Sequence, residues 1–210
     1  EELKQEVENK RLYNNGAPHK EDNVWKWYNE DGNMVLGSAM HDEYNEEVNE
    51  YYQNGNIKSK QNFLNGVLDG KYKYYYETGN LRQSGCIKHK QKDGEIKTYL
   101  ENGNLILIEK FKNGKKHGKV KSYHQYKDLV GRNNRIETWK NGKLHGEWID
   151  YHLNNKERAK GNMLYGMMDG KWMFWYHNGV KELECEFDFG NPVGSAKIYH
   201  DNGVLKEVVT

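Results

Sequence analysis

Apolar and polar residues alternate along short segments of this chain, and glycine-containing turns separate the segments. Residues 71–76, for example, read Lys-Tyr-Lys-Tyr-Tyr-Tyr, so that aromatic rings alternate with lysine at the start of the segment. A period of two residues is typical of a half-buried β-strand, whereas an amphipathic helix needs apolar residues at spacings of three and four. No segment shows the helical spacing over about eleven residues. The pattern therefore predicts β-strands and very little helix.

A turn motif of the form Tyr-x-x-x-Gly recurs at a nearly constant interval. It is complete at 75–79 and 99–103, and Trp175 replaces the tyrosine in a later copy. The last residue of each copy is called its anchor here, and the anchors lie at 32, 55, 79, 103, 127, 155, 179 and 203. They are 23, 24, 24, 24, 28, 24 and 24 residues apart, and an insertion near 129–134 accounts for the long interval. The chain therefore contains about eight copies of one repeat.

Other positions follow the same period. Large or apolar residues recur seven positions before the anchor, at Trp25, Val48, Tyr72, Ile96, Val120, Trp148, Trp172 and Ala196. A second series recurs about eight positions after it, with one member displaced by the insertion: Met40, Phe63, Ile87, Phe111, Trp139, Met163 and Phe187. A second turn follows, most often Asn-Gly as at 65–66, which favours the primed turns of β-hairpins. Each repeat is therefore predicted to be a hairpin.

These hairpins are expected to depend on one another for stability. A single hairpin is marginal in water, so the repeats must stack in register and bury their rings together. We predict an all-β fold, an elongated single-sheet solenoid of about eight tandem antiparallel hairpins. Residues 1–210 are expected to form one repeat domain, with the Trp and Phe series as ladders in its core.

Several segments carry a resemblance to a known family. Residues 75–81 read Tyr-Tyr-Glu-Thr-Gly-Asn-Leu and 111–118 read Phe-Lys-Asn-Gly-Lys-Lys-His-Gly, while 142–148 and 166–172 both end in Gly-x-Trp. The pattern resembles the MORN repeat, in the variant form of bacterial antitoxin-like repeat proteins, over residues 9–209. It departs from that form near 38–47 and in 127–155. The resemblance implies stacked hairpins and non-catalytic roles in scaffolding, membrane attachment or toxin neutralisation.

Composition agrees with a thin architecture. Hydrophobic residues make up 35% of the chain and charged residues 30%, against roughly 45–50% apolar residues in ordinary soluble domains. The 16 Tyr and 6 Trp nevertheless argue against a disordered chain. Cys86 and Cys185 form no disulfide framework, and both are predicted to be free thiols. Because the chain begins at Glu1 rather than Met, we expect that an upstream segment has been removed; the compartment, cytoplasmic or exported behind a signal peptide, stays open.

The sequence contains no arrangement of residues that is typical of an enzyme. The nine His are scattered, and neither a nucleophile motif nor a phosphate-binding loop is present. His117 and His145 precede glycine at a position that carries Asp in other repeats, so we interpret them as turn residues. The sequence predicts a chain that is not an enzyme, with no catalytic residues, no metal site and no cofactor.

Charge is unevenly distributed along the chain. Residues 1–50 carry 5 basic and 13 acidic groups, residues 56–125 carry 15 basic and 6 acidic groups, and residues 126–210 carry 12 of each. The basic middle is either a solvated lysine surface or a surface for an acidic protein or an anionic lipid membrane. Nucleic acid is a poor fit because Arg82 is the one arginine in this segment.

The candidate partner-binding residues are the anchor tyrosines, which lie four residues before each anchor, and the lysines two residues before these tyrosines. In a regular strand they share one face, and the apolar series seven positions before the anchor lies on the other, although a bulge would reverse this assignment. The candidates are Tyr75, Tyr99, Tyr123, Lys73, Lys97 and Lys121. The tyrosines are interpreted either as core or as a groove that grips a partner. We predict a binding protein for another protein, with antitoxin, immunity and scaffold roles as its specific forms; the alternatives are anionic membrane binding through the basic middle and a passive spacer.

Overall fold

The structure, a computed structural model, describes residues 19–21, 24–28, 34–36, 45–125 and 131–210. The chain divides into two compact units, residues 1–92 and 93–210, and each is described by itself. All regular elements among the described residues are β-strands or short turns. The predicted all-β fold of antiparallel hairpins is therefore confirmed. The extent of the repeat domain stays a prediction, and part of the insertion near 129–134 lies outside the described residues.

Unit 1 contains two antiparallel sheets. The smaller sheet has the order β1-β2-β3, and in the larger one β4 to β7 are neighbours in chain order, with β8 paired to β7. The strands of unit 1 are β1 (His19–Glu21), β2 (Val24–Tyr28), β3 (Met34–Leu36), β4 (Asn45–Tyr51), β5 (Ile57–Leu64), β6 (Val67–Tyr75), β7 (Leu81–Lys88) and β8 (Gln91–Lys92).

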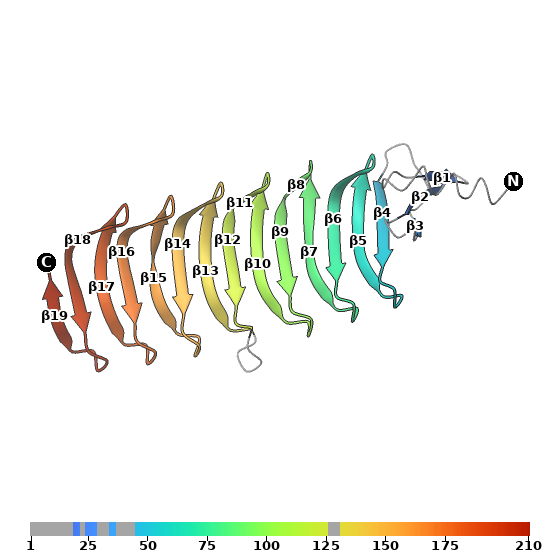
Figure 1. The fold of residues 1–210 in the computed structure, drawn as a ribbon. Coiled ribbons are helices and arrows are strands. Elements are labelled where there is room, and N and C mark those ends of the chain that lie inside the picture. Colours follow the sequence, from blue (N-terminus) through green and yellow to red (C-terminus); the bar gives the residue numbers. More distant parts are fainter. Residues whose placement is uncertain (1–18, 22–23, 29–33, 37–44, 126–130) are drawn as a thin grey trace. The chain divides into compact units, whose positions relative to one another are not determined.

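Unit 2 is an antiparallel meander in which neighbours in sequence are neighbours in the sheet (Figure 1). Its path runs β9-β10-β12-β13-β14-β15-β16-β17-β18-β19, and β11 pairs with β10. The strands of unit 2 are β9 (Gly94–Tyr99), β10 (Leu105–Lys112), β11 (Lys115–Lys116), β12 (Gly118–Tyr123), β13 (Asn133–Lys140), β14 (Lys143–Tyr151), β15 (Glu157–Leu164), β16 (Met167–Trp175), β17 (Lys181–Asp188), β18 (Asn191–Tyr199) and β19 (Leu205–Val209).

The two turn motifs of the sequence form the two edges of each hairpin sheet. At the anchor turn of β4 and β5, the Gly55 N–H donates to the Tyr52 carbonyl at 3.0 Å, and the Tyr52 N–H donates to the Asn56 carbonyl at 2.8 Å. At the turn between β5 and β6, Asn65 and Gly66 have φ of 51° and 74°, the primed geometry that Asn-Gly predicts. The pairing register shifts next to the anchor tyrosine, for example between Tyr74 and Tyr75.

Side chains from alternate strand positions make two unlike faces. The buried residues of unit 1 share one face: Val48, Ser59 and Tyr72. The buried residues Ile96, Val120, Asp150, Ala159 and Trp172 of unit 2 also share one face, which is called the core face. The series seven positions before the anchor is therefore core in both units, except that Trp148 and Ala196 are half-buried and the side chain of Trp25 lies outside the described residues.

Aromatic rings lie directly over glycines in this core. In unit 2 the ring of Trp172 covers Gly161, so that a Cβ at residue 161 would lie 2.1 Å from Trp172 Cδ2. Trp148 contacts the same ring at a centroid distance of 5.4 Å. In unit 1 Tyr72 covers Gly85 in the same way. The second predicted ladder, Phe63, Phe111, Trp139 and Phe187, is half-buried.

Consecutive repeats are also joined along the anchor-turn edge by side chains that reach the next repeat. In unit 1 the Tyr52 hydroxyl donates to the Tyr75 carbonyl at 2.7 Å, and in unit 2 the Tyr176 hydroxyl donates to the Tyr199 carbonyl at 2.8 Å. Asn178 Nδ2 donates to the Asp201 carbonyl at 2.9 Å. These bonds explain why a polar ring and an Asn recur in this turn, since both satisfy backbone groups of the neighbouring hairpin.

Candidate interaction surfaces

The face opposite the core of unit 2 carries a continuous cross-strand row of lysine and aliphatic residues. Each member lies directly opposite the next on the neighbouring strand, so all of them point to the same side of the sheet. This lysine row consists of Lys97, Ile108, Lys121, Ile136, Ile149, Lys160, Met173, Glu184, Lys197 and Val208. The face that carries it is called the lysine face.

The candidate lysines of unit 2 differ in their ion pairing. Lys97 Nζ lies 3.1 Å from Glu95 Oε1, and this hydrogen bond raises the pKa of Lys97. Lys121 is exposed and has no carboxylate within 4.0 Å among the residues that the structure describes. The structure therefore brings Lys97 and Lys121 into one row, with Ile108 between them, but only Lys121 keeps its charge uncompensated.

Unit 1 has its own short row of the same kind. Asn49, Lys60, Lys73 and Ser84 lie opposite one another across β4 to β7. Lys60 is 3.9 Å from Glu47, whereas Lys73 is exposed and has no carboxylate partner in the described part of unit 1. Lys73 is thus the position in unit 1 that corresponds to Lys121.

The three candidate tyrosines, Tyr75, Tyr99 and Tyr123, are half-buried. A register shift lies at each of their hairpins, and the Tyr75 carbonyl accepts the hydrogen bond from Tyr52. Each residue therefore contributes to the hairpin turn and leaves part of its ring at the surface. Their assignment to partner binding stays a prediction.

Sequence reasoning missed an ionic cluster in the core of unit 2. Asp150 is 2% exposed, and its two carboxylate oxygens pair with Arg135 and Arg158. The Arg135 guanidinium also lies 4.9 Å from the centroid of the Trp148 ring. Asp150 lies five residues before its anchor, and the equivalent residue of an earlier repeat is the uncharged Thr98. A charged residue at this position was the signal in the sequence that could have revealed the cluster. Because both oxygens of Asp150 are paired, removal of this side chain would leave two arginines without their carboxylate partner, and no free oxygen of Asp150 remains for acid–base chemistry.

No group of three or more His, Cys, Asp or Glu side chains among the described residues could hold a metal ion. His145 packs against Tyr165 at a centroid distance of 5.3 Å, and the backbone N–H of His117 donates to the Lys110 carbonyl. The interpretation of both as turn residues is wrong for His145, which lies within strand β14, because the turn itself is formed by Asn141 and Gly142. Cys86 and Cys185 are free, and burial raises the pKa of the Cys185 thiol. In the described part of the chain no helix has the length and apolar character to cross a membrane.

Comparison with models of known families identifies the repeat of this chain. The profile of the MORN repeat variant matches residues 47–65, 68–89, 92–113, 168–188 and 192–210. The chain belongs to the MORN-repeat family. The longest gap between matched segments, residues 114–167, holds the insertion and the lost turn glycines. Strands β12 to β15 form there nevertheless. No curated protein matches the chain.

Proposed function

We propose that this MORN-repeat protein is a non-enzymatic module that binds another, acidic protein along its lysine face. The proposal rests on the lysine row of unit 2, in which Lys97, Lys121 and Lys160 lie among Ile108, Ile136 and Ile149 on directly opposed strand positions. The aliphatic pair Ile136 and Ile149 is flanked by the uncompensated Lys121 and by Lys160, which pairs with Glu147 and Glu157. Such a surface suits a partner that presents carboxylates around an apolar patch.

The energetic division between the faces supports this choice. The core face holds most of the buried residues and the Asp150 cluster, so its side chains are committed to stability. Among the buried residues that the structure describes in unit 2, Ile149 alone lies on the lysine face, where it is flanked by Ile136 and Lys160. Substitutions of the exposed lysines on this face should therefore leave the fold intact while changing what it binds.

The experiment is crosslinking and affinity capture from the native source, followed by a binding assay with the purified partner. We expect Lys121→Glu to weaken the complex by roughly tenfold, because it reverses an uncompensated charge of the row. Lys115→Glu, at the start of β11, makes the same change of charge outside the row and is expected to have little effect. Recovery of no protein partner, or equal effects of the two substitutions, argues against the proposal.

Anionic membrane binding is the second candidate, and the excess of basic groups in residues 56–125 favours it. Lys71, Lys73, Lys88, Lys90, Lys92, Lys97 and Lys121 are the residues that would meet the lipid. Sedimentation with vesicles of phosphatidylcholine alone and with added phosphatidylserine separates the two candidates, since membrane binding requires the anionic lipid and falls with salt. Absence of sedimentation at low salt removes this candidate.

Antitoxin, immunity and scaffold roles are finer forms of the proposal and rest on the family resemblance. Each makes a different demand on the partner. An antitoxin or immunity protein must inhibit a toxin encoded beside it, whereas a scaffold must bind two proteins at once. Coexpression with the product of the adjacent gene tests the first role, and a ternary pull-down tests the second.

A further inference from the structure

The hairpin-turn edge of unit 2, opposite the anchor turns, contains two residues in an unfavourable backbone conformation. Four two-residue turns lie along this edge, and the first residue of each has positive φ: Asn113 (50°), Asn141 (52°), Tyr165 (53°) and Phe189 (45°). Asn tolerates this region, but a bulky side chain there costs on the order of 1–2 kcal/mol. The last two turns therefore keep aromatic residues at a cost in backbone strain.

Burial does not offset this strain. Tyr165 is 60% exposed and Phe189 is 50% exposed, and Met167 and Val193 beside them are also exposed. The ring of Tyr165 contacts His145, and Lys143 Nζ lies 5.9 Å from its centroid. Exposed aromatic side chains in a strained conformation are typical of a contact surface rather than of a core.

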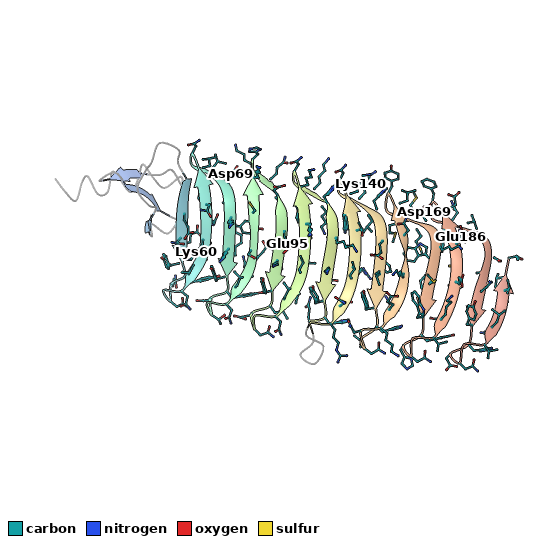
Figure 2. All side chains as sticks on the ribbon, turned by 180° about the vertical axis from the view of Figure 1, so that it is seen from behind. Lys60, Asp69, Glu95, Lys140, Asp169 and Glu186 are labelled. Atoms are coloured by element: carbon teal, nitrogen blue, oxygen red, sulfur yellow. The ribbon has the colours of Figure 1, made fainter. Side chains whose placement is uncertain are left out.

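Two residues of opposite charge lie on the strands on either side of the hairpin that carries Tyr165. Tyr165 lies in the turn of the β15–β16 hairpin; Lys143 begins β14 on one side of this hairpin, and Asp188 ends β17 on the other. Both are exposed, and neither has an ion-pair partner within 4.0 Å among the described residues. Figure 2 shows Lys140, which lies opposite Lys143 in the β13–β14 hairpin, at this same edge of the sheet.

We propose that this edge binds a second copy of the chain around a two-fold axis perpendicular to the sheet and passing through the Tyr165 turn. Strands are about 4.8 Å apart, so Lys143 and Asp188 each lie about 7 Å from the axis along the edge, on opposite sides. The rotation places Lys143 of one copy against Asp188 of the other, twice. It also brings the two Tyr165 rings together on the axis.

The same rotation gives Phe189 a matching surface. The turn that lies opposite it in the second copy is Asn141-Gly142, because both turns are two strands from the Tyr165 turn. Glycine leaves space for the ring, as Gly161 does for Trp172 within the core. The contact is therefore self-complementary in both charge and shape, which is the requirement for an isologous dimer.

The predicted dimer is weak. Its apolar contacts come from a few turn residues, well below the 1,200 Å² or so of buried surface that stable complexes need, so a dissociation constant of about 1 µM to 1 mM is expected. This dimer is independent of the protein-binding function proposed above, since it uses the turn edge and not the lysine row.

Sedimentation equilibrium of the full chain over this concentration range tests the dimer. Tyr165→Asn restores the preferred turn residue and is expected to keep the fold, by circular dichroism, while weakening association by roughly tenfold or more. Lys143→Asp and Asp188→Lys each create two like-charge contacts in the dimer, so each variant alone is expected to lose association to a similar extent.

Mixing these two charge variants gives the decisive result. In the mixed dimer both contacts again join opposite charges, so an equimolar mixture of Lys143→Asp and Asp188→Lys is expected to recover the dimer that neither forms alone. Monomeric wild-type protein at about 1 mM overturns the proposal. So does a dimer that Tyr165→Asn leaves unchanged, or a mixture that fails to recover association.

Discussion

Adding a methyl group at Gly161 is expected to destabilise unit 2 more than the same change at any turn glycine. A Cβ at this position would lie 2.1 and 2.2 Å from Trp172 Cδ2 and Cε2, far inside the 3.4 Å of an ordinary contact. The ring must therefore move by more than 1 Å. It has no free space to do so, because Trp172 is 2% exposed and packs against Trp148 and Phe174.

The cost follows from what the displaced ring loses. Overpacking of a core costs about 1–3 kcal/mol, and loss of a large buried aromatic side chain costs about 3–5 kcal/mol. We expect Gly161→Ala to fall between these limits, at about 3 kcal/mol. The hydrogen bond from Trp172 Nε1 to the Asn162 carbonyl, at 3.2 Å, is strained by the same movement.

Urea denaturation followed by tryptophan fluorescence and circular dichroism measures this cost. Gly194→Ala is the matched control, because nothing lies within 4 Å of its added methyl group and only its φ of 67° opposes the change. The free energy of unfolding of this control variant is expected to fall by about 1 kcal/mol. A double variant, Gly161→Ala with Trp172→Leu, should lose less than the sum of its single changes. If Gly161→Ala costs no more than Gly194→Ala, Trp172 does not cover Gly161.

Three further changes test other contacts. Asp150→Ala removes the carboxylate that pairs with Arg135, whose guanidinium lies beside Trp148, and is expected to lower the free energy of unfolding by about 1–3 kcal/mol in urea denaturation. An unchanged free energy of unfolding would show that the cluster is not formed. Tyr52→Phe removes the 2.7 Å hydrogen bond to the next repeat and is expected to cost about 1 kcal/mol in the same assay, whereas an unchanged midpoint would contradict that role. The hydrogen bond from Lys119 lowers the pKa of Glu147, so this pair stabilises the fold above the usual Glu pKa and loses its effect as the pH falls through the lowered pKa. Lys119→Met should therefore raise the pKa of Glu147 in an NMR titration of the carboxyl groups. An unchanged Glu147 titration would refute the pairing.

The sequence predicted the features that depend on residues close together in the chain. Asn65-Gly66 specifies a primed turn by its own conformational preferences, and the alternation around Tyr72 specifies which side of a strand is buried. Both signals are repeated, so a weak preference in one copy is reinforced by the others. The hairpin fold and its core series could therefore be predicted.

Features that depend on register between strands could not be predicted in the same way. Gly161 is opposite Trp148, yet the ring that covers it belongs to Trp172 on the next strand. The ion pair of Asp150 with Arg135 joins residues on β14 and β13, and the bulges near the turns change which positions meet. A repeat period fixes which residues are equivalent, but the contacts of one residue depend on the positions of the bulges.

Residues that interrupt the repeat carry more information about partners than residues that follow it. Lys97 and Lys121 are equivalent and lie two strands apart, so a partner that contacts only such lysines gains similar interactions when it shifts by one repeat. Glu184 breaks this equivalence, because it places a carboxylate in the row where Lys160 stands one repeat earlier. Glu184 is paired with Lys181 at 2.9 Å, so a carboxylate that a shifted partner brings to this position meets no attractive cation there. Under the proposed function, an acidic partner is therefore expected to avoid the register that places its carboxylates at Glu184, because Ile149 and Met173, at the positions equivalent to Lys121, also offer those carboxylates no attraction.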